Sequence, residues 1–175
     1  MHKTSHDSET PAHGQQVMSA CAFIHDEKDG EPVLFLAKRA DTKKFLPGMY
    51  EFPGGHIDYG EDLTLGLARE IREEFDVSVS IGDPFAAFTY ENPVKVSHII
   101  EVVYFARLAD PIEKIVLNPE DHSTWEWFTE GDVRSRTKDL IPESGITTYT
   151  PGSDPEYEAI LRGFALLKGK RLHFG

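Results

Sequence analysis

The segment that decides the fold is EFPGGHIDYGEDLTLGLAREIREEFDV, residues 51–77, which contains eight carboxylates and only two arginines. Within residues 63–75 an apolar residue recurs at every fourth position, which is the spacing of an amphipathic helix. Asp62 precedes this run and can cap its first turn. Because Pro-Gly-Gly at 53–55 interrupts regular structure, we expect a short extended piece, a turn and then this helix.

The predicted helix carries three carboxylates on one patch. At about 3.6 residues per turn, Glu70, Glu73 and Glu74 fall within about 100° of arc, beside the apolar stripe. Such a patch usually faces water, and its like charges repel by roughly a few tenths of a kcal/mol per pair. A divalent cation would turn the repulsion into attraction, and carboxylate oxygens favour Mg²⁺ or Mn²⁺ over zinc. Arg69 beside Glu70 can orient one carboxylate, and Gly55 can bring a backbone carbonyl close to a cation.

Residues 55–77 resemble the Nudix box, in which Gly is followed after five residues by Glu and after seven more by Arg-Glu-U-x-Glu-Glu-x-Gly-U, with U aliphatic. The matching residues are Gly55, Glu61, Arg69, Glu70, Ile71, Glu73, Glu74 and Val77. Asp76 departs from the pattern, because the family usually has Gly there to end the helix in a left-handed turn. Asp is among the few residues that tolerate this geometry, so we expect a slightly strained helix end and intact chemistry.

The resemblance implies an α/β (α+β) fold, the Nudix-type α/β/α sandwich with a central mixed sheet. It implies hydrolysis of a pyrophosphate bond in a nucleoside diphosphate linked to another group, of the nucleoside triphosphate or nucleotide sugar type. By the same resemblance Glu70, Glu73 and Glu74 hold one or more Mg²⁺ (or Mn²⁺), the Gly55 carbonyl adds a ligand, and Arg69 braces the carboxylates. The physical argument agrees, since Mg²⁺ neutralises a pyrophosphate and lowers the pKa of a bound water.

Two other functions stay open. One is a non-catalytic Nudix-like nucleotide-binding or regulatory module, although such modules usually lose box carboxylates that this chain keeps. The other is a structural cation-binding domain, which would not need Arg69 beside the acidic cluster.

The rest of the chain predicts mixed strands and helices. We expect a hairpin of strands at 17–25 and 33–39, strands at 77–81, 85–90, 96–108 and around Trp125, a helical turn at 130–136, a long loop over 140–156 and a closing helix at 156–169. Residues 1–16 lack apolar periodicity and are expected to be a disordered tail. The chain of 175 residues is then a single domain over residues 17–175.

Composition limits the partners. The formal net charge of −12 argues against binding to polymeric nucleic acid, so the expected partner is a small-molecule nucleotide, with a homodimer left open. No run of about 20 apolar residues predicts a membrane helix. Cys21 is the single cysteine, which excludes an internal disulfide and suits a cytoplasmic location.

Further candidates surround the box. Arg39 and Lys38 could bind a substrate phosphate or only solubilise a strand end. The general base could be a box carboxylate or one of Glu120 and Asp121. Aromatic residues that could stack on a base, but are more often core, are Phe88, Tyr90, Trp125 and Trp127.

Two histidines and the choice of substrate complete the sequence-based expectations. His98 and His122 have no ligand spacing and are expected to be structural. Residues 37–55 partly resemble coenzyme A pyrophosphatases and also generic MutT-like enzymes, so the substrate stays open.

Overall fold

The computed structural model describes residues 16–142 and 154–169. The strands are β1 (Gln16–Lys28), β2 (Glu31–Arg39), β3 (Tyr50–Glu51), β4 (Gly54–His56), β5 (Val79–Asn92), β6 (Ser97–Leu108) and β7 (His122–Thr129). The helices are α1 (Leu63–Phe75), the 3₁₀ turn η1 (Ile112–Lys114), α2 (Glu130–Ser135), α3 (Thr137–Leu140) and α4 (Pro155–Leu167).

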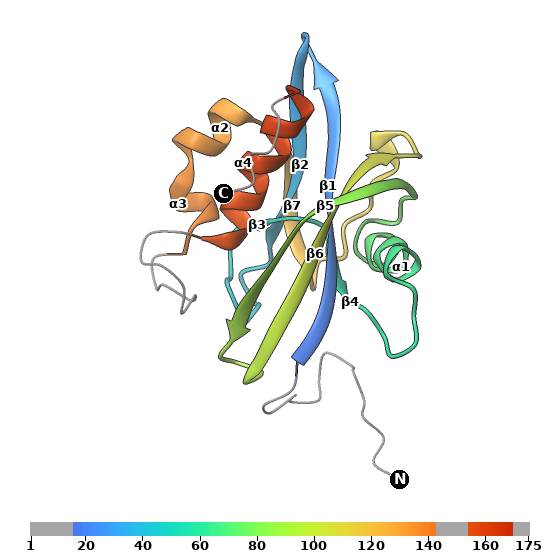
Figure 1. Ribbon diagram of the computed structural model, residues 1–175, viewed down its shortest axis with the longest axis vertical. Coiled ribbons are helices and arrows are strands. Elements are labelled where there is room, and N and C mark those ends of the chain that lie inside the picture. Colours follow the sequence, from blue (N-terminus) through green and yellow to red (C-terminus); the bar gives the residue numbers. More distant parts are fainter. Residues whose placement is uncertain (1–15, 143–153, 170–175) are drawn as a thin grey trace.

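The described strands form one mixed sheet between two helical layers (Figure 1). The main path runs β3-β2-β1-β6-β5, with β4 paired to β1 and β7 paired to β2. Strands β1 and β6 are parallel, while β1 and β2 form the expected antiparallel hairpin. Figure 1 shows α1 on one side of the sheet and α2, α3 and α4 on the other. The expected α/β/α sandwich with a central mixed sheet is confirmed.

Strand β1 separates two apolar clusters because its side chains alternate between the faces of the sheet. Phe23 points into the α4 layer, where its ring lies 5.3 Å from the ring of Phe164. Ile24, the next residue, belongs to the opposite cluster together with Ile71 of α1. Since both faces are covered, β1 reads as a nearly continuous apolar run.

Helix α1 has the predicted limits. The Asp62 side chain accepts hydrogen bonds from the backbone N–H groups of Thr64 and Leu65, as expected of a cap. The helix ends at Asp76 in the left-handed conformation, with φ 53° and ψ 31°. Gly66 lies in a tight contact, since an added β-carbon would be 2.7 Å from Ile57 Cδ1. This contact explains a glycine inside a helix.

Two sequence-based predictions are wrong in detail. The strands expected at 77–81 and 85–90 are one strand, β5, whose register against β6 shifts on both sides of Pro84. A bulge accommodates a proline because the residue there needs no ladder hydrogen bond. The loop expected over 140–156 is shorter at both ends, because Leu140 belongs to α3 and α4 begins at Pro155.

The chain ends are described in part. The predicted tail, residues 1–16, lies outside the described residues except for Gln16, which opens β1. Most of the predicted 140–156 loop also lies outside them. The closing helix is confirmed as α4, capped by Asp154, and Gly169 follows it at φ +73°. Among the described helices, none is long and apolar enough to cross a membrane.

Candidate active site

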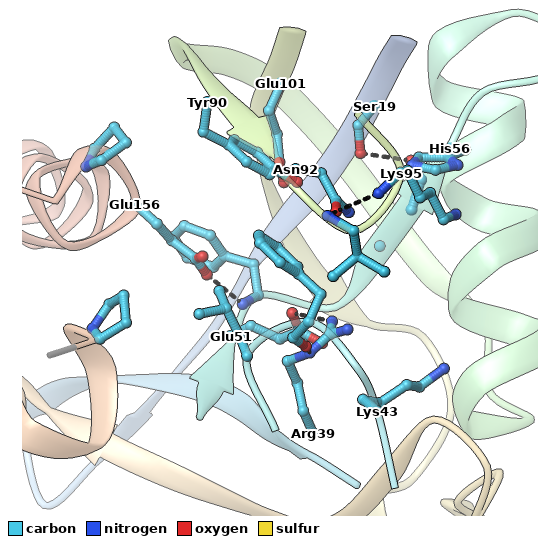
Figure 2. A pocket seen from close by; sticks show the side chains of 18 of the residues that line it. Ser19, Arg39, Lys43, Glu51, His56, Tyr90, Asn92, Lys95, Glu101 and Glu156 are labelled. Atoms are coloured by element: carbon cyan, nitrogen blue, oxygen red, sulfur yellow. Dashed lines mark hydrogen bonds and ion pairs between the residues drawn. The ribbon is translucent and has the colours of Figure 1, made fainter. Parts of the chain in front are cut away.

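A cavity of about 540 Å³ opens beside the box residues, between the sheet, the loop at 40–49 and the start of α4. Figure 2 shows its side chains converging from several strands and from α4. Its lining includes Gly54, Gly55, His56 and Glu74 on the side of α1 and Asp154, Pro155 and Glu156 on the side of α4, with Tyr90 and Glu101 of the sheet between them. The lining also includes the cationic side chains Arg39, Lys43, Lys44 and Lys95.

The glycines of β4 bring the backbone against two box carboxylates. Gly54 has φ +141°, and an added β-carbon would lie 2.7 Å from Cys21 Cα, so only glycine fits. Its N–H donates to Glu74 Oε2 at 3.2 Å. An added β-carbon on Gly55 would lie 2.8 Å from Glu70 Cδ. The strand is therefore packed directly against Glu70 and Glu74.

Arg69 connects the box carboxylates to one another. Its Nε and Nη2 donate to the two oxygens of Glu61, each at 2.9 Å. Its Nη1 donates to Glu70 at 2.6 Å and, more weakly, to Glu73 at 3.4 Å. Nη2 also donates to the His56 carbonyl at 3.1 Å. The guanidinium thus fixes the helix carboxylates relative to the strand end at His56.

The three expected metal carboxylates have different surroundings. The Glu73 side chain is 61% exposed and lies beside Arg69. Burial raises the pKa of Glu70, and the Arg69 guanidinium offsets part of that effect. Glu74 lines the cavity and has no cationic partner among the described residues. Burial, followed by the charge of Glu51, raises the pKa of Glu74 well above its usual range.

The donor set fits a hard divalent cation that is completed by other ligands. In the described parts of the chain, no three Asp, Glu, His or Cys side chains converge into a ready-made metal site. Mg²⁺, however, is usually held by one or two carboxylates together with waters and substrate phosphates. Glu70, Glu74 and the Gly55 carbonyl offer such a set, and a cation would offset the charge of Glu74, which desolvation and the neighbouring Glu51 disfavour. Ser19 Oγ already donates to that carbonyl at 2.9 Å.

Arg39 lines the cavity, whereas Lys38 does not. Arg39 Nη1 donates to both oxygens of Glu51, at 2.8 and 2.7 Å. Lys38 extends to the other side of β2, where its Nζ lies 6.0 Å from the Tyr50 ring. Sequence reasoning missed Glu51, although an acid within the short extended piece MYEF at 49–52 was a usable signal.

The two candidates for a general base outside the box, Glu120 and Asp121, differ in their distance from it. Asp121 forms an ion pair with Lys43, and its charge contributes to the raised pKa of Glu74. Glu120 is exposed at the turn before β7. Of the two, Asp121 is therefore the one near the box.

The end of the cavity nearest α4 is acidic and aromatic, which the sequence did not reveal. Glu101 is only 9% exposed, and the Tyr90 hydroxyl and the Cys21 thiol donate to it. Glu156 accepts a hydrogen bond from the Phe52 N–H at 2.7 Å. A single acid inside the apolar run HIIEVVYF was the available signal for Glu101.

The aromatic candidates divide between the two faces of the sheet. Tyr90 and Phe88 line the cavity. The Tyr90 ring is nearly parallel to that of Phe45, with centroids 6.1 Å apart. Trp125 and Trp127 instead pack on Phe35 in the cluster beside α1, where aromatic residues are core.

The two expected structural histidines lie in different places. His98 is in β6 next to Gln16, outside the cavity lining. His122 is buried at the start of β7 and contacts Glu51, so it touches a cavity residue.

Known proteins resemble this chain in sequence. A family model described as NUDIX domain matches residues 15–147. The chain is 27% identical over 115 residues to the NAD-capped RNA hydrolase NudC of Stutzerimonas stutzeri, covering 62% of this chain and 40% of that protein. It is 32% identical over 82 residues to the 8-oxo-dGTP diphosphatase of Haemophilus influenzae, covering 47% of this chain and 58% of that protein. The chain therefore spans about half the length of these curated relatives.

A solved structure with the same architecture is the MutT protein from Methanosarcina mazei Go1. Its TM-score is 0.65 at 20% identity, covering 93% of this chain and 99% of that one. At this identity the likeness shows the fold alone.

Proposed function

Because the chain belongs to the Nudix family, we propose that it hydrolyses a pyrophosphate bond in a nucleoside diphosphate linked to another group, with Mg²⁺ or Mn²⁺ as cofactor. The observation that carries the proposal is the half-buried Glu74 carboxylate, which lines a cavity that also contains cationic side chains and which lacks a cationic partner among the described residues. The cationic side chains of the cavity can accept the phosphate groups of a substrate. The neighbouring Glu74 carboxylate can hold a metal ion that is bound to those phosphates.

Glu70, Glu74 and the Gly55 carbonyl would hold the metal ion, and Glu73 stays the predicted further ligand from the solvent side. When bound, the ion neutralises the pyrophosphate and lowers the pKa of a coordinated water. Arg69 keeps Glu70 in place through its 2.6 Å hydrogen bond, so the ligands are ordered before substrate arrives.

The remaining residues of the cavity bind and orient the substrate. Arg39 and Lys44 supply positive charge for phosphate oxygens. Tyr90 offers a ring face to a nucleobase, and Glu156 offers a carboxyl group to its N–H groups. Glu74 and Asp121 are the carboxylates available to accept a proton from water. This arrangement of the cavity residues favours a substrate whose phosphates lie near Gly55 and whose nucleoside lies near α4.

We propose a nucleoside triphosphate or a nucleotide sugar as the substrate. The names of the two curated relatives, an 8-oxo-dGTP diphosphatase and an NAD-capped RNA hydrolase, support a nucleotide joined through a phosphoanhydride. Cytoplasmic location and a homodimer stay predictions.

The test is product release by the purified chain on a panel of nucleoside triphosphates, nucleotide sugars and coenzyme A, with Mg²⁺ present. The parent is expected to release product from at least one compound, and Glu74→Gln is expected to lose that activity. Glu158→Gln, on the exposed side of α4, is the matched control and should keep it. Tight nucleotide binding by the parent without product from any compound would instead favour a binding module.

A further inference from the structure

His122 has a polar contact at one end of its ring and none at the other. It lies at the start of β7 with 2% of its surface exposed. Its Nε2 is 3.0 Å from Glu51 Oε1. Its ring stacks on Phe75, the last residue of α1, at a centroid distance of 5.1 Å and an angle of 22°. Nδ1 is buried without a hydrogen-bond partner in the described residues.

The contact with Glu51 decides which nitrogen carries the proton. A neutral imidazole has one N–H donor and one acceptor nitrogen. Burial works to raise the pKa of Glu51, but Arg39 and then His122 hold it below its usual value, so Glu51 is an ionised acceptor. Nε2 must therefore be the donor in this contact.

Glu51, held by His122, in turn holds Arg39 in place. Both Glu51 oxygens accept hydrogen bonds from Arg39 Nη1, and Arg39 Nε donates to the Phe45 carbonyl at 2.9 Å. Nη2 makes no hydrogen bond with the described residues, although Arg39 lines the cavity. Figure 2 shows Arg39 and Glu51 side by side among the residues that line the cavity. Two sides of the guanidinium are thus occupied, and the Nη2 donors remain for a ligand.

We propose that His122 is a positioning residue, which holds Glu51 and through it Arg39 so that Arg39 Nη2 binds a phosphate oxygen of the substrate. The inference rests on the proposed function of the cavity. It assigns His122 a role in substrate binding beyond its packing on Phe75.

Three substitutions separate this role from packing. His122→Phe keeps a ring against Phe75 and removes the donor. His122→Gln carries an amide N–H2 at about the position of Nε2, whereas the shorter His122→Asn carries it at about the position of Nδ1. His25→Phe is the control, because His25 also packs against an aromatic ring, with 5.8 Å to Phe105, and does not line the cavity.

With the best substrate of the parent, His122→Phe is expected to raise KM about tenfold, the effect of losing one hydrogen bond to a charged group. Its kcat should stay within about threefold, because the residues proposed to hold the metal ion are unchanged. His122→Gln should recover most of the KM, and His122→Asn should not. A parental KM in His122→Phe, or equal KM values in the Gln and Asn variants, would overturn the proposal.

A binding measurement keeps this result distinct from failure of the proposed hydrolysis. Calorimetry with Mg²⁺ and inorganic pyrophosphate should show the same order of affinity: parent, then His122→Gln, then His122→Phe. If the parent hydrolyses nothing but shows this order, the hydrolase proposal fails and the role of His122 stands. If the parent hydrolyses nucleotides and all variants bind pyrophosphate equally, the hydrolase proposal stands and the role of His122 fails. An Nε2 without a proton in ¹⁵N NMR spectra of the parent would also contradict the inference.

Discussion

The carboxyl group of Glu70 occupies the space that the missing side chain of Gly55 leaves, since a β-carbon there would lie 2.8 Å from Glu70 Cδ. Gly55→Ala is expected to push Glu70 away and to lower kcat/KM at least about tenfold, because the proposed ligands lose their arrangement. Gly131→Ala is the control, since its β-carbon would only reach Thr129 Oγ1 at 3.5 Å. Steady-state kinetics of both variants check this, and parental activity in Gly55→Ala would contradict it.

The two neighbouring carboxylates Glu73 and Glu74 should contribute differently to kcat. Glu74→Gln removes the half-buried cavity carboxylate and is expected to lower kcat by at least about 10²-fold. Glu73→Gln should lower kcat only about tenfold, because that side chain is 61% exposed. Without metal, Glu74→Gln should also raise the free energy of unfolding, since it removes a charge that burial disfavours. Kinetics and urea unfolding measure both effects, and equal kinetic losses would contradict the assignment.

Metal and protons should compete for Glu74. Its raised pKa means that the carboxyl group must lose a proton before it can bind a cation, so activity should fall on the acid side. Excess EDTA should abolish turnover. Raising the Mg²⁺ concentration should move the acid limb of the pH–rate profile to lower pH. A limb that does not move with Mg²⁺ would exclude this competition.

Glu156 should make stability fall as pH rises. Burial, followed by the charge of Glu101, raises the pKa of Glu156 well above its usual range. A carboxyl group that holds its proton more tightly when folded stabilises the fold below its unfolded pKa, and this contribution is lost as pH rises through the folded pKa. Glu156→Gln should therefore match the parent near pH 4. Near pH 8 its free energy of unfolding should exceed that of the parent by at least about 1 kcal/mol, because the buried amide carries no charge.

Urea unfolding at the two pH values checks the prediction for Glu156. Glu158→Gln is the control on the same helix and should change stability little at either pH, because Glu158 is exposed. A Glu156→Gln difference from the parent that is equal at both pH values would contradict the assignment.

The left-handed Asp76 should carry a small strain at the end of α1. Its φ of 53° suits glycine better than any other residue. Asp76→Gly is expected to stabilise the fold by about 0.5 kcal/mol, and Asp76→Ala to destabilise it by about 1 kcal/mol. Thermal unfolding measures both changes, while kcat should stay at the parental value. A destabilised Asp76→Gly would show that the Asp side chain contributes more than its backbone costs.

The sequence by itself determined helix α1 and its limits. The fourfold spacing of apolar residues, the Asp62 cap and the left-handed Asp76 all follow from local rules, and the structure has each of them. The hairpin of β1 and β2 was also predictable, because the turn residues lie between two apolar runs. In contrast, the Gly-Asp-Pro at 82–84 resembled a turn, and only pairing with β6 made it a bulge within β5.

Only the tertiary structure decided which charged residues share the cavity. Glu51, Glu101 and Glu156 are far apart in the chain and meet because β3, β6 and the start of α4 converge there. Partial burial beside the cavity then distinguishes Glu74 from the exposed Glu73, although the two are neighbours in the sequence. The physical reason is that periodicity fixes the face of a helix on which a side chain lies. How dry and how charged its surroundings become depends on the elements that pack against that face.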